Sequence, residues 1–253
     1  TGNAGTLTVN LGAKASTNSL GVLGAALTIA DTGSATTDTV NIVNKAKLST
    51  GVNLDVFAGN DVTSTGYENV SINTGSGTGN DQADIGTLTI TPDSTAAAVS
   101  LTLTGNNSFT ASTSVTTSST GLMTIDASGM EAQAAGTNTL TITSTSHGTS
   151  GTGNITGSAG DDVITVGNFK STISGGAGND DLDGGTAIDY IDGGAGKDTI
   201  TLGGTALVTI TGGDGDDTVN VAGNLTYGQS IKGGAGTDII SITTDESAAD
   251  FSV

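Results

Sequence analysis

The chain has 253 residues, enough for one large or two ordinary domains, and Gly, Ser, Thr and Ala dominate it. Its 25 acidic residues against 6 lysines give a net charge of −19, which argues against nucleic acid and anionic membranes as partners. No cysteine is present for disulfides, and no apolar run approaches the roughly 18 residues of a membrane span. Small side chains cannot fill a wide core, so this composition favours an elongated coil with a thin one over a disordered chain.

Short runs that alternate apolar with polar residues predict half-buried strands along the first part of the chain. Gly, Asn, Asp and Ser separate the runs and mark turns. Helical periodicity is nearly absent, and Ala127–Ala135 is the single weak helical candidate. The expected strands are Thr6–Leu11, Ala26–Ala30, Thr39–Val43, Leu54–Phe57, Asn69–Ile72, Thr87–Thr91, Val99–Leu103, Leu122–Ile125 and Thr139–Thr143.

The chain divides softly near Ser150. Residues 1–150 are expected to form an irregular β-rich region, and residues 151–253 a regular repeat region. The Ser/Gly/Thr-rich run from Ser146 to Gly153 is either a linker or a wide loop of one continuous solenoid, and we favour the continuous solenoid. The chain begins with Thr and reads as though cut in mid-turn at its other end, so we expect it to be part of a longer protein.

A nonapeptide pattern recurs five times between Gly157 and Ser241. Position one is glycine, position four is glycine, position six is aspartate and position eight is apolar, as in GSAGDDVI, GGAGNDDL, GGAGKDTI, GGDGDDTV and GGAGTDII. The copies begin at Gly157, Gly175, Gly193, Gly212 and Gly233, so successive copies start two nonapeptides apart or slightly more. One turn is therefore expected to contain two loops and two strands. Ile164, Leu182, Ile200, Val219 and Ile240 occupy position eight and are expected to point into the core.

The half-turns between these copies have lost most of the pattern. They start near Val166, Gly184, Gly203 and Asn224, and only the second keeps its aspartate, Asp189. One edge of the coil is therefore predicted to carry complete loops, with one further site at Asp189 on the other edge.

These residue types suit calcium. Ca²⁺ takes six to eight oxygen ligands, which backbone carbonyls and carboxylates supply. Glycines allow positive φ and let carbonyls turn inward without a Cβ clash. The alternative is that such Gly-Asp runs are ordinary surface turns. The predicted carboxylate ligands are Asp162, Asp180, Asp198, Asp217 and Asp238. The other predicted loop ligands, mainly through their carbonyls, are Gly157, Ala159, Asp161, Gly175, Gly176, Ala177, Gly178, Asn179, Gly193, Gly194, Ala195, Gly196, Lys197, Gly212, Gly213, Asp214, Gly215, Asp216, Gly234 and Gly236.

A weaker echo of the motif lies upstream, where the spacing of Asp61 and Asp81 is close to the expected length of one turn. They form either a further calcium site or two solvated turn aspartates.

No enzyme signature is found: His147 is the only histidine and has no partner for zinc or base chemistry. We therefore expect a protein that is not an enzyme.

The five motifs resemble the calcium-binding repeats of the repeats-in-toxin (RTX) proteins. That resemblance covers Gly157 to Ser241, about a third of the chain. It implies an all-β fold, an elongated parallel and right-handed β-solenoid with a β-roll in its C-terminal third. It also implies Ca²⁺ as the bound ion. Without metal, stacked aspartates about 4.8 Å apart would repel each other, so folding and metal binding are expected to be one equilibrium.

A second resemblance covers more of the chain. The phrases Gly121–Gly129, Glu68–Ile72 and Thr139–Thr143, followed by the repeats, are similar to the C-terminal parts of Gram-negative surface-layer (S-layer) proteins. That family implies export by a type I system and assembly into a lattice on the outer cell surface. The partners it implies are copies of the same protein, together with a cell-surface glycan or other domains of the chain.

Two other functions remain open at this point. The chain could be the stalk of a secreted RTX adhesin, or the C-terminal roll of a secreted enzyme whose catalytic domain lies elsewhere. Thr-x-Thr strands also allow an ice-binding face, although their uneven spacing argues against a matched lattice.

Overall fold

The computed structural model describes residues 5–11, 26–31, 38–44, 60–75, 82–92, 98–115, 121–132, 139–146, 151–187, 189–203, 207–223 and 228–243. Within these ranges every regular element is a strand. No helix in the described part is long and apolar enough to cross a membrane. The architecture is all-β, as the sequence predicts.

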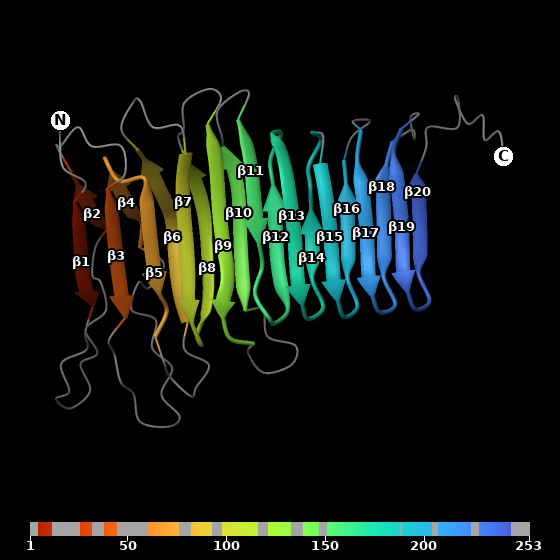
Figure 1. Cartoon of the computed structure of the whole chain (residues 1–253), viewed down its shortest axis with the longest axis horizontal. Coiled ribbons are helices and arrows are strands. Elements are labelled where there is room, and N and C mark those ends of the chain that lie inside the picture. Colours follow the sequence, from red (N-terminus) through yellow and green to blue (C-terminus); the bar gives the residue numbers. More distant parts are fainter. Residues whose placement is uncertain are drawn as a thin grey trace.

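The strands form two parallel sheets of ten strands each, and successive strands alternate between them (Figure 1). The first sheet contains β1 (Thr6–Leu11), β3 (Thr39–Asn44), β5 (Asn69–Asn73), β7 (Ala98–Gly105), β9 (Leu122–Met130), β11 (Thr152–Thr156), β13 (Lys170–Ala177), β15 (Asp189–Ala195), β17 (Thr209–Asp214) and β19 (Ser230–Ala235). The second contains β2 (Leu27–Ala30), β4 (Val62–Thr65), β6 (Gln82–Thr91), β8 (Ser108–Val115), β10 (Leu140–Ser146), β12 (Asp162–Val166), β14 (Asp181–Asp183), β16 (Thr199–Leu202), β18 (Thr218–Ala222) and β20 (Ile239–Thr243). Because each strand pairs with the strand one turn on, the chain is a parallel β-solenoid.

The length of a turn differs along the coil. In the repeat region Ile173 of β13 pairs with Ile191 of β15, a spacing that equals two nonapeptides. This confirms the two-loop, two-strand period predicted for the repeats. Upstream the turns are much longer, since Val40 of β3 pairs with Val70 of β5. Pairing of β9 with β11 and of β11 with β13 carries the first sheet across residue 150 without interruption.

The core is a thin apolar layer between the sheets, built from columns of residues that stack in register. One column of the first sheet consists of Val70, Leu101, Ile125, Ile155, Ile173, Ile191 and Ile210, all almost fully buried. Full burial of such a side chain contributes about 1.5–3 kcal/mol relative to exposure. Four predicted position-eight residues, Ile164, Leu182, Ile200 and Val219, are fully buried as expected. Ile240 is 45% exposed, contrary to the prediction, because β20 is the last strand of its sheet and pairs on one side only.

Most predicted strands coincide with observed ones, and Leu54–Phe57 lies outside the described residues. The structure adds β4, β8 and β11, where small residues occupy inward positions and weaken the apolar pattern. In β11, for example, the space beside Gly153 is filled by the ring of Phe169 and the side chain of Met123. The helical candidate Ala127–Ala135 is wrong over its first residues, because Ala127 to Met130 continue β9 and bury Ala127 and Met130.

Candidate metal centre

The aspartate-ended loops follow one edge of the coil, where strands of the first sheet end and strands of the second sheet begin (lower edge of Figure 1). Four loops, at 175–180, 193–198, 212–217 and 233–238, share one backbone conformation. Their glycines at positions two and four all have φ between 113° and 140°. A Cβ on Gly196 would also run into the carbonyl oxygen of Gly178, one loop earlier. Glycine at these positions therefore lets the loops stack in direct contact.

The first motif, at 157–162, is built differently from the other four. Ser158 occupies position two, and neither Gly157 nor Gly160 has a positive φ. The Ser158 hydroxyl donates to Asp162 Oδ1 at 2.6 Å, and the Ser158 N–H donates to Asp162 Oδ2 at 2.6 Å. Both carboxylate oxygens of Asp162 are thus hydrogen bonded within their own loop. The sequence prediction of five equivalent loops is not met at this first copy.

The position-six aspartates form a column through the stacked loops. From the second aspartate on, each Oδ1 accepts the backbone N–H of the aspartate one turn earlier. The N–H of Asp162 donates to Asp180, that of Asp180 to Asp198 and that of Asp198 to Asp217, each at 2.9 Å, and that of Asp217 to Asp238 at 3.1 Å. The first four aspartates are buried, and Asp238 on the outermost loop is half-buried. The column therefore brings all five predicted carboxylates together.

The second carboxylate oxygen is unpartnered in the middle of this column. Asp180 Oδ2, Asp198 Oδ2 and Asp217 Oδ2 are buried and accept no hydrogen bond. Each Oδ2 lies beside the position-one glycine of its own loop. The carbonyl oxygen of the position-one glycine in the next loop lies beside that same glycine. A Cβ placed on Gly212, for instance, would lie 2.5 Å from Asp217 Oδ2 and would overlap the carbonyl oxygen of Gly233. Acceptor oxygens thus converge with no donor between them, which costs free energy unless a proton or a cation is present.

The pKa values of the buried aspartates also indicate that their negative charge lacks a partner. Burial, followed by the charge of Asp162, raises the pKa of Asp180 to about 8. Burial also raises the pKa of Asp198 to about 6, although the N–H of Asp180 opposes the shift. The pKa of Asp162 rises to about 6 through burial, against the hydrogen bonds from Ser158. The column without metal therefore resists full ionisation near neutral pH.

These oxygens fit a calcium ion. Among the described residues, no three His, Cys, Asp or Glu side chains are grouped closely enough to hold a metal by themselves. A cation in this column would therefore need carbonyl oxygens as well as carboxylates, a mixture typical of Ca²⁺. Asp180, Asp198 and Asp217 would hold it through Oδ2, together with the carbonyls of Gly193, Gly212 and Gly233. The ion would supply the positive charge that the buried carboxylates lack.

Positions three and five have structural roles that the sequence did not reveal. The carbonyls of Ala195, Asp214 and Ala235 at position three accept the N–H of the position-four glycine one loop earlier, at 2.7–2.8 Å. The side chains of Asp161 and Asn179 at position five accept the backbone N–H of the residue at the same position one turn later, each at 2.8 Å. Asp216 does the same for Thr237 at 2.8 Å. These predicted ligand positions therefore also tie neighbouring loops together.

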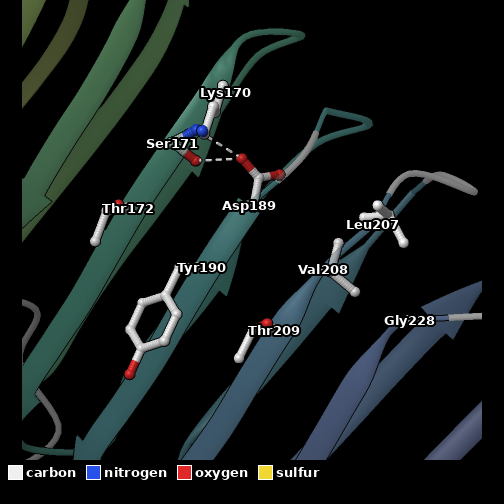
Figure 2. A pocket seen from close by; sticks show the side chains of 9 residues that line it. All are labelled: Lys170, Ser171, Thr172, Asp189, Tyr190, Leu207, Val208, Thr209 and Gly228. Carbon is white, nitrogen blue, oxygen red and sulfur yellow. Dashed lines mark hydrogen bonds between the residues drawn. The ribbon is translucent and has the colours of Figure 1, made fainter.

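Asp189 lies at the opposite edge, at the start of β15, and lines a small cavity of about 250 Å³ with Lys170, Tyr190 and Leu207 (Figure 2). Its Oδ1 accepts the Ser171 N–H at 2.8 Å and the Ser171 hydroxyl at 2.6 Å, and its Oδ2 is buried and unpartnered. Burial raises its pKa. The turns on either side place Ser171 and Val208 beside it, so no second carboxylate stacks on Asp189.

Of the upstream pair, the structure describes Asp61 only. Asp61 directly precedes β4, and Val62 pairs with Leu88, so the turn here is longer than expected and places Thr87 beside Asp61. Asp61 Oδ1 accepts the Thr87 N–H at 2.8 Å. The turn that follows Asp61 is therefore longer than the sequence separation of Asp61 and Asp81. Asp81 lies outside the described residues, as does His147.

Sequence reasoning missed two buried carboxylates at the edge that carries Asp189. Asp38 precedes β3 and Glu68 precedes β5, and both are at most 3% exposed. Neither lies in a glycine-rich motif, and they are far apart in the sequence, so no local signal marks them.

Comparison of the chain with protein-family models, with curated proteins and with solved structures found no match.

Proposed function

We propose that this chain is a calcium-stabilised structural β-solenoid that assembles with copies of itself into a lattice on the outer surface of a bacterial cell. The observation that carries the calcium part is the column of buried, unpartnered Oδ2 atoms of Asp180, Asp198 and Asp217, each beside a glycine carbonyl of the next loop. The lattice and the secreted location rest on the resemblance of the Gly121–Gly129 phrase and its neighbours to S-layer proteins.

Three gaps between loops fit an ion. They are the gaps that follow the loops ending in Asp180, Asp198 and Asp217, because each pairs an unpartnered Oδ2 with a carbonyl oxygen of the next loop. The gap after Asp162 lacks this arrangement, since Ser158 occupies both oxygens of that carboxylate. We therefore propose three ions in the column and none in the gap after Asp162.

Calcium in these gaps links metal binding to folding. The metal-free column places buried carboxylates one strand spacing apart, and a cation removes their repulsion and fixes the turns. Extracellular calcium modules bind at roughly 10⁻⁴ to 10⁻³ M, a range that suits a protein exported from a low-calcium interior and folded outside.

The sides of the solenoid support a role in contacts between copies. In the first sheet, outward residues stack in register as rows of short polar side chains, such as Ser71, Thr102, Asp126, Thr156 and Ser174. Such rows give the first sheet a long polar outer face. We propose that this face meets neighbouring copies or a cell-surface glycan, and that the chain has no catalytic role.

The test counts ions and watches assembly in the same preparations. Equilibrium dialysis of the whole chain should find that Asp198→Asn binds fewer calcium ions than the unsubstituted chain. Negative-stain microscopy should show arrays of the unsubstituted chain, with its native flanking sequence, in millimolar calcium and none after Asp198→Asn. Asp183→Asn, an exchange in β14 outside the column, is the matched control and should keep both properties.

Two results would count against the proposal. Equal calcium binding by Asp198→Asn and the unsubstituted chain would remove the metal column. A chain that binds calcium but stays monomeric at high concentration would remove the lattice and favour the stalk of an adhesin.

A further inference from the structure

Five carboxylate oxygens are buried without a hydrogen-bond partner in the described part of the chain, and they share one local arrangement. They are the Oδ2 atoms of Asp38, Asp180, Asp189, Asp198 and Asp217. Each aspartate stands immediately before a strand or at its first residue, and its Oδ1 accepts a backbone N–H from the preceding turn. Asp38 is the one member of this group outside the repeat region.

Asp38 and Glu68 reproduce the pairing seen within the calcium column. The Asp38 N–H donates to Glu68 Oε2 at 2.9 Å, as the Asp180 N–H donates to Asp198 Oδ1 at 2.9 Å. The two residues occupy equivalent positions on successive turns, since Thr39 pairs with Asn69. Asp38 is 1% exposed and Glu68 is 3% exposed. Two carboxylates are thus held about one strand spacing apart, roughly 4.8 Å, away from water.

The backbone around Asp38 is tightly fixed. Its carbonyl accepts the N–H groups of Glu68 and Asn69, at 3.2 and 3.0 Å, and the amide of the Asn69 side chain at 3.3 Å. Gly5 donates its N–H to Asp38 Oδ1. Since Oδ1 is directed toward the preceding turn, Oδ2 is left inside the edge of the coil, where no described residue donates to it.

Asp31 and Tyr67 lie at the same edge of the coil as this pair. Asp31 directly follows β2 and donates its N–H to the Thr65 carbonyl at 2.8 Å, and its backbone also packs against Gly66. Tyr67 is 7% exposed and directly precedes Glu68 in the chain. Tyr67 is therefore the tyrosine that adjoins this pair in sequence.

We propose that Asp38 and Glu68 form a second calcium site, outside the nonapeptide repeats and on the opposite edge of the coil. The unpartnered Oδ2 of Asp38 is the atom that requires a cation, and Glu68 supplies the second carboxylate. A calcium-sized ion fits better than Mg²⁺, because the oxygens come from separate turns in irregular geometry, whereas Mg²⁺ demands a near-ideal octahedron. This inference goes beyond the proposed function, since the site contains no residue of the repeats.

Such a site would stabilise the wide turns of the N-terminal half. The turn from β3 to β5 and the turn from β5 to β7 are each much longer than a turn of the repeats. A cation that joins β3 to β5 at their first residues would hold these turns in register. The role parallels that of the repeat column at the other edge, but its residues are brought together from positions far apart in sequence.

Terbium luminescence tests the site directly. Tb³⁺ occupies oxygen-rich calcium sites and emits when a nearby tyrosine is excited, and this chain has three tyrosines and no tryptophan. We expect the whole chain with Tb³⁺ to show tyrosine-sensitised emission that calcium competes away. Tyr67→Phe should lose most of the emission and keep its calcium stoichiometry, because only the antenna is removed. Asp38→Asn should lose the same emission and bind one calcium ion fewer, while its Asn oxygen still accepts the Gly5 N–H.

Matched controls separate this site from the repeats. Tyr190→Phe, beside Asp189, and Asp126→Asn, on β9, should keep the calcium-competed emission. Asp180→Asn should lower the calcium count and leave the Tyr67 emission intact, so that failure of the repeat column and failure of this site are distinguishable. Emission that survives Tyr67→Phe overturns the proposal, even if Asp38→Asn fails to fold. An unchanged calcium count in folded Asp38→Asn also overturns it and shows that the pair is held by a shared proton.

Discussion

Acid should replace the calcium proposed for the repeat region, because protons would neutralise the same column of carboxylates as the proposed ions. The unfolded chain gives Asp180 an ordinary pKa of 3.8, whereas the folded, metal-free chain raises it to about 8. Between these values the folded state binds more protons than the unfolded state. The stability of the metal-free repeats is therefore greatest below about pH 4, falls as pH rises and levels off above about pH 8.

The size of the effect follows from the pKa shift. One pKa unit corresponds to about 1.4 kcal/mol, so Asp180 alone costs at most about 3 kcal/mol between pH 5 and pH 7. Water at the open edge of the loop screens part of this, so we expect about 1.5 to 3 kcal/mol. Asp162 and Asp198, with pKa values of about 6, add to the loss mainly below pH 6. Because whole domains are stable by only about 5–15 kcal/mol, this loss is large enough to unfold a thin coil.

Circular dichroism of the whole chain in excess chelator, followed from pH 5 to pH 8, measures the transition. Hydrogen exchange should assign the loss of protection to residues 175–243 and leave β5 to β9 protected. Asp180→Asn removes one titrating group and keeps an acceptor for the Asp162 N–H. In chelator at pH 8 this variant should be more stable than the unsubstituted chain, and in millimolar calcium it should be less stable.

Asp183→Asn, at the end of β14, should change neither condition and serves as the control. Amide protection of the repeats that is independent of pH in chelator would refute this reasoning. So would an Asp180→Asn variant that is less stable than the unsubstituted chain in both conditions, because the buried charge would then carry no penalty.

Three further outcomes can be measured by thermal unfolding in calcium. Gly196→Ala should destabilise the repeats by about 2 kcal/mol or more, because Gly196 has φ of 130° and an added Cβ would overlap the preceding loop. Gly203→Ala should be nearly neutral, because a Cβ there meets only ordinary contacts at 3.5 Å. Ser158→Ala should cost about 1–3 kcal/mol because it removes a hydroxyl donor from the buried carboxylate of Asp162, and Ser158→Thr should restore part of it. Ile191→Ala should cost about 2–5 kcal/mol by opening a cavity in the core column, and an equal stability of variant and unsubstituted chain would contradict the stacked core.

The sequence by itself determined the repeat region because its information there is local. Glycine at positions two and four permits the positive φ that the stacked loops adopt, and an apolar residue at position eight predicts the side that faces the core. A nearly fixed period of two nonapeptides then places Asp180, Asp198 and Asp217 in one column without further knowledge. Alternating runs such as Asn69–Ile72 were equally sufficient for most strands upstream.

Only the tertiary structure decided which residues meet where the turn length varies. Asp61 lies beside Thr87, further along the chain than the motif spacing predicts, and Asp38 meets Glu68 from far away in the sequence. Sheet register, and not sequence spacing, sets the neighbour. Hydrogen bonding likewise depends on three-dimensional placement. At position six of the first loop, Ser158 donates to both carboxylate oxygens of the aspartate, whereas the position-six aspartate in each of the next three loops has an unpartnered Oδ2. Each short segment of sequence determines its own local conformational preference. The pairing of distant turns and the hydrogen bonding of buried carboxylates depend instead on how the whole coil stacks.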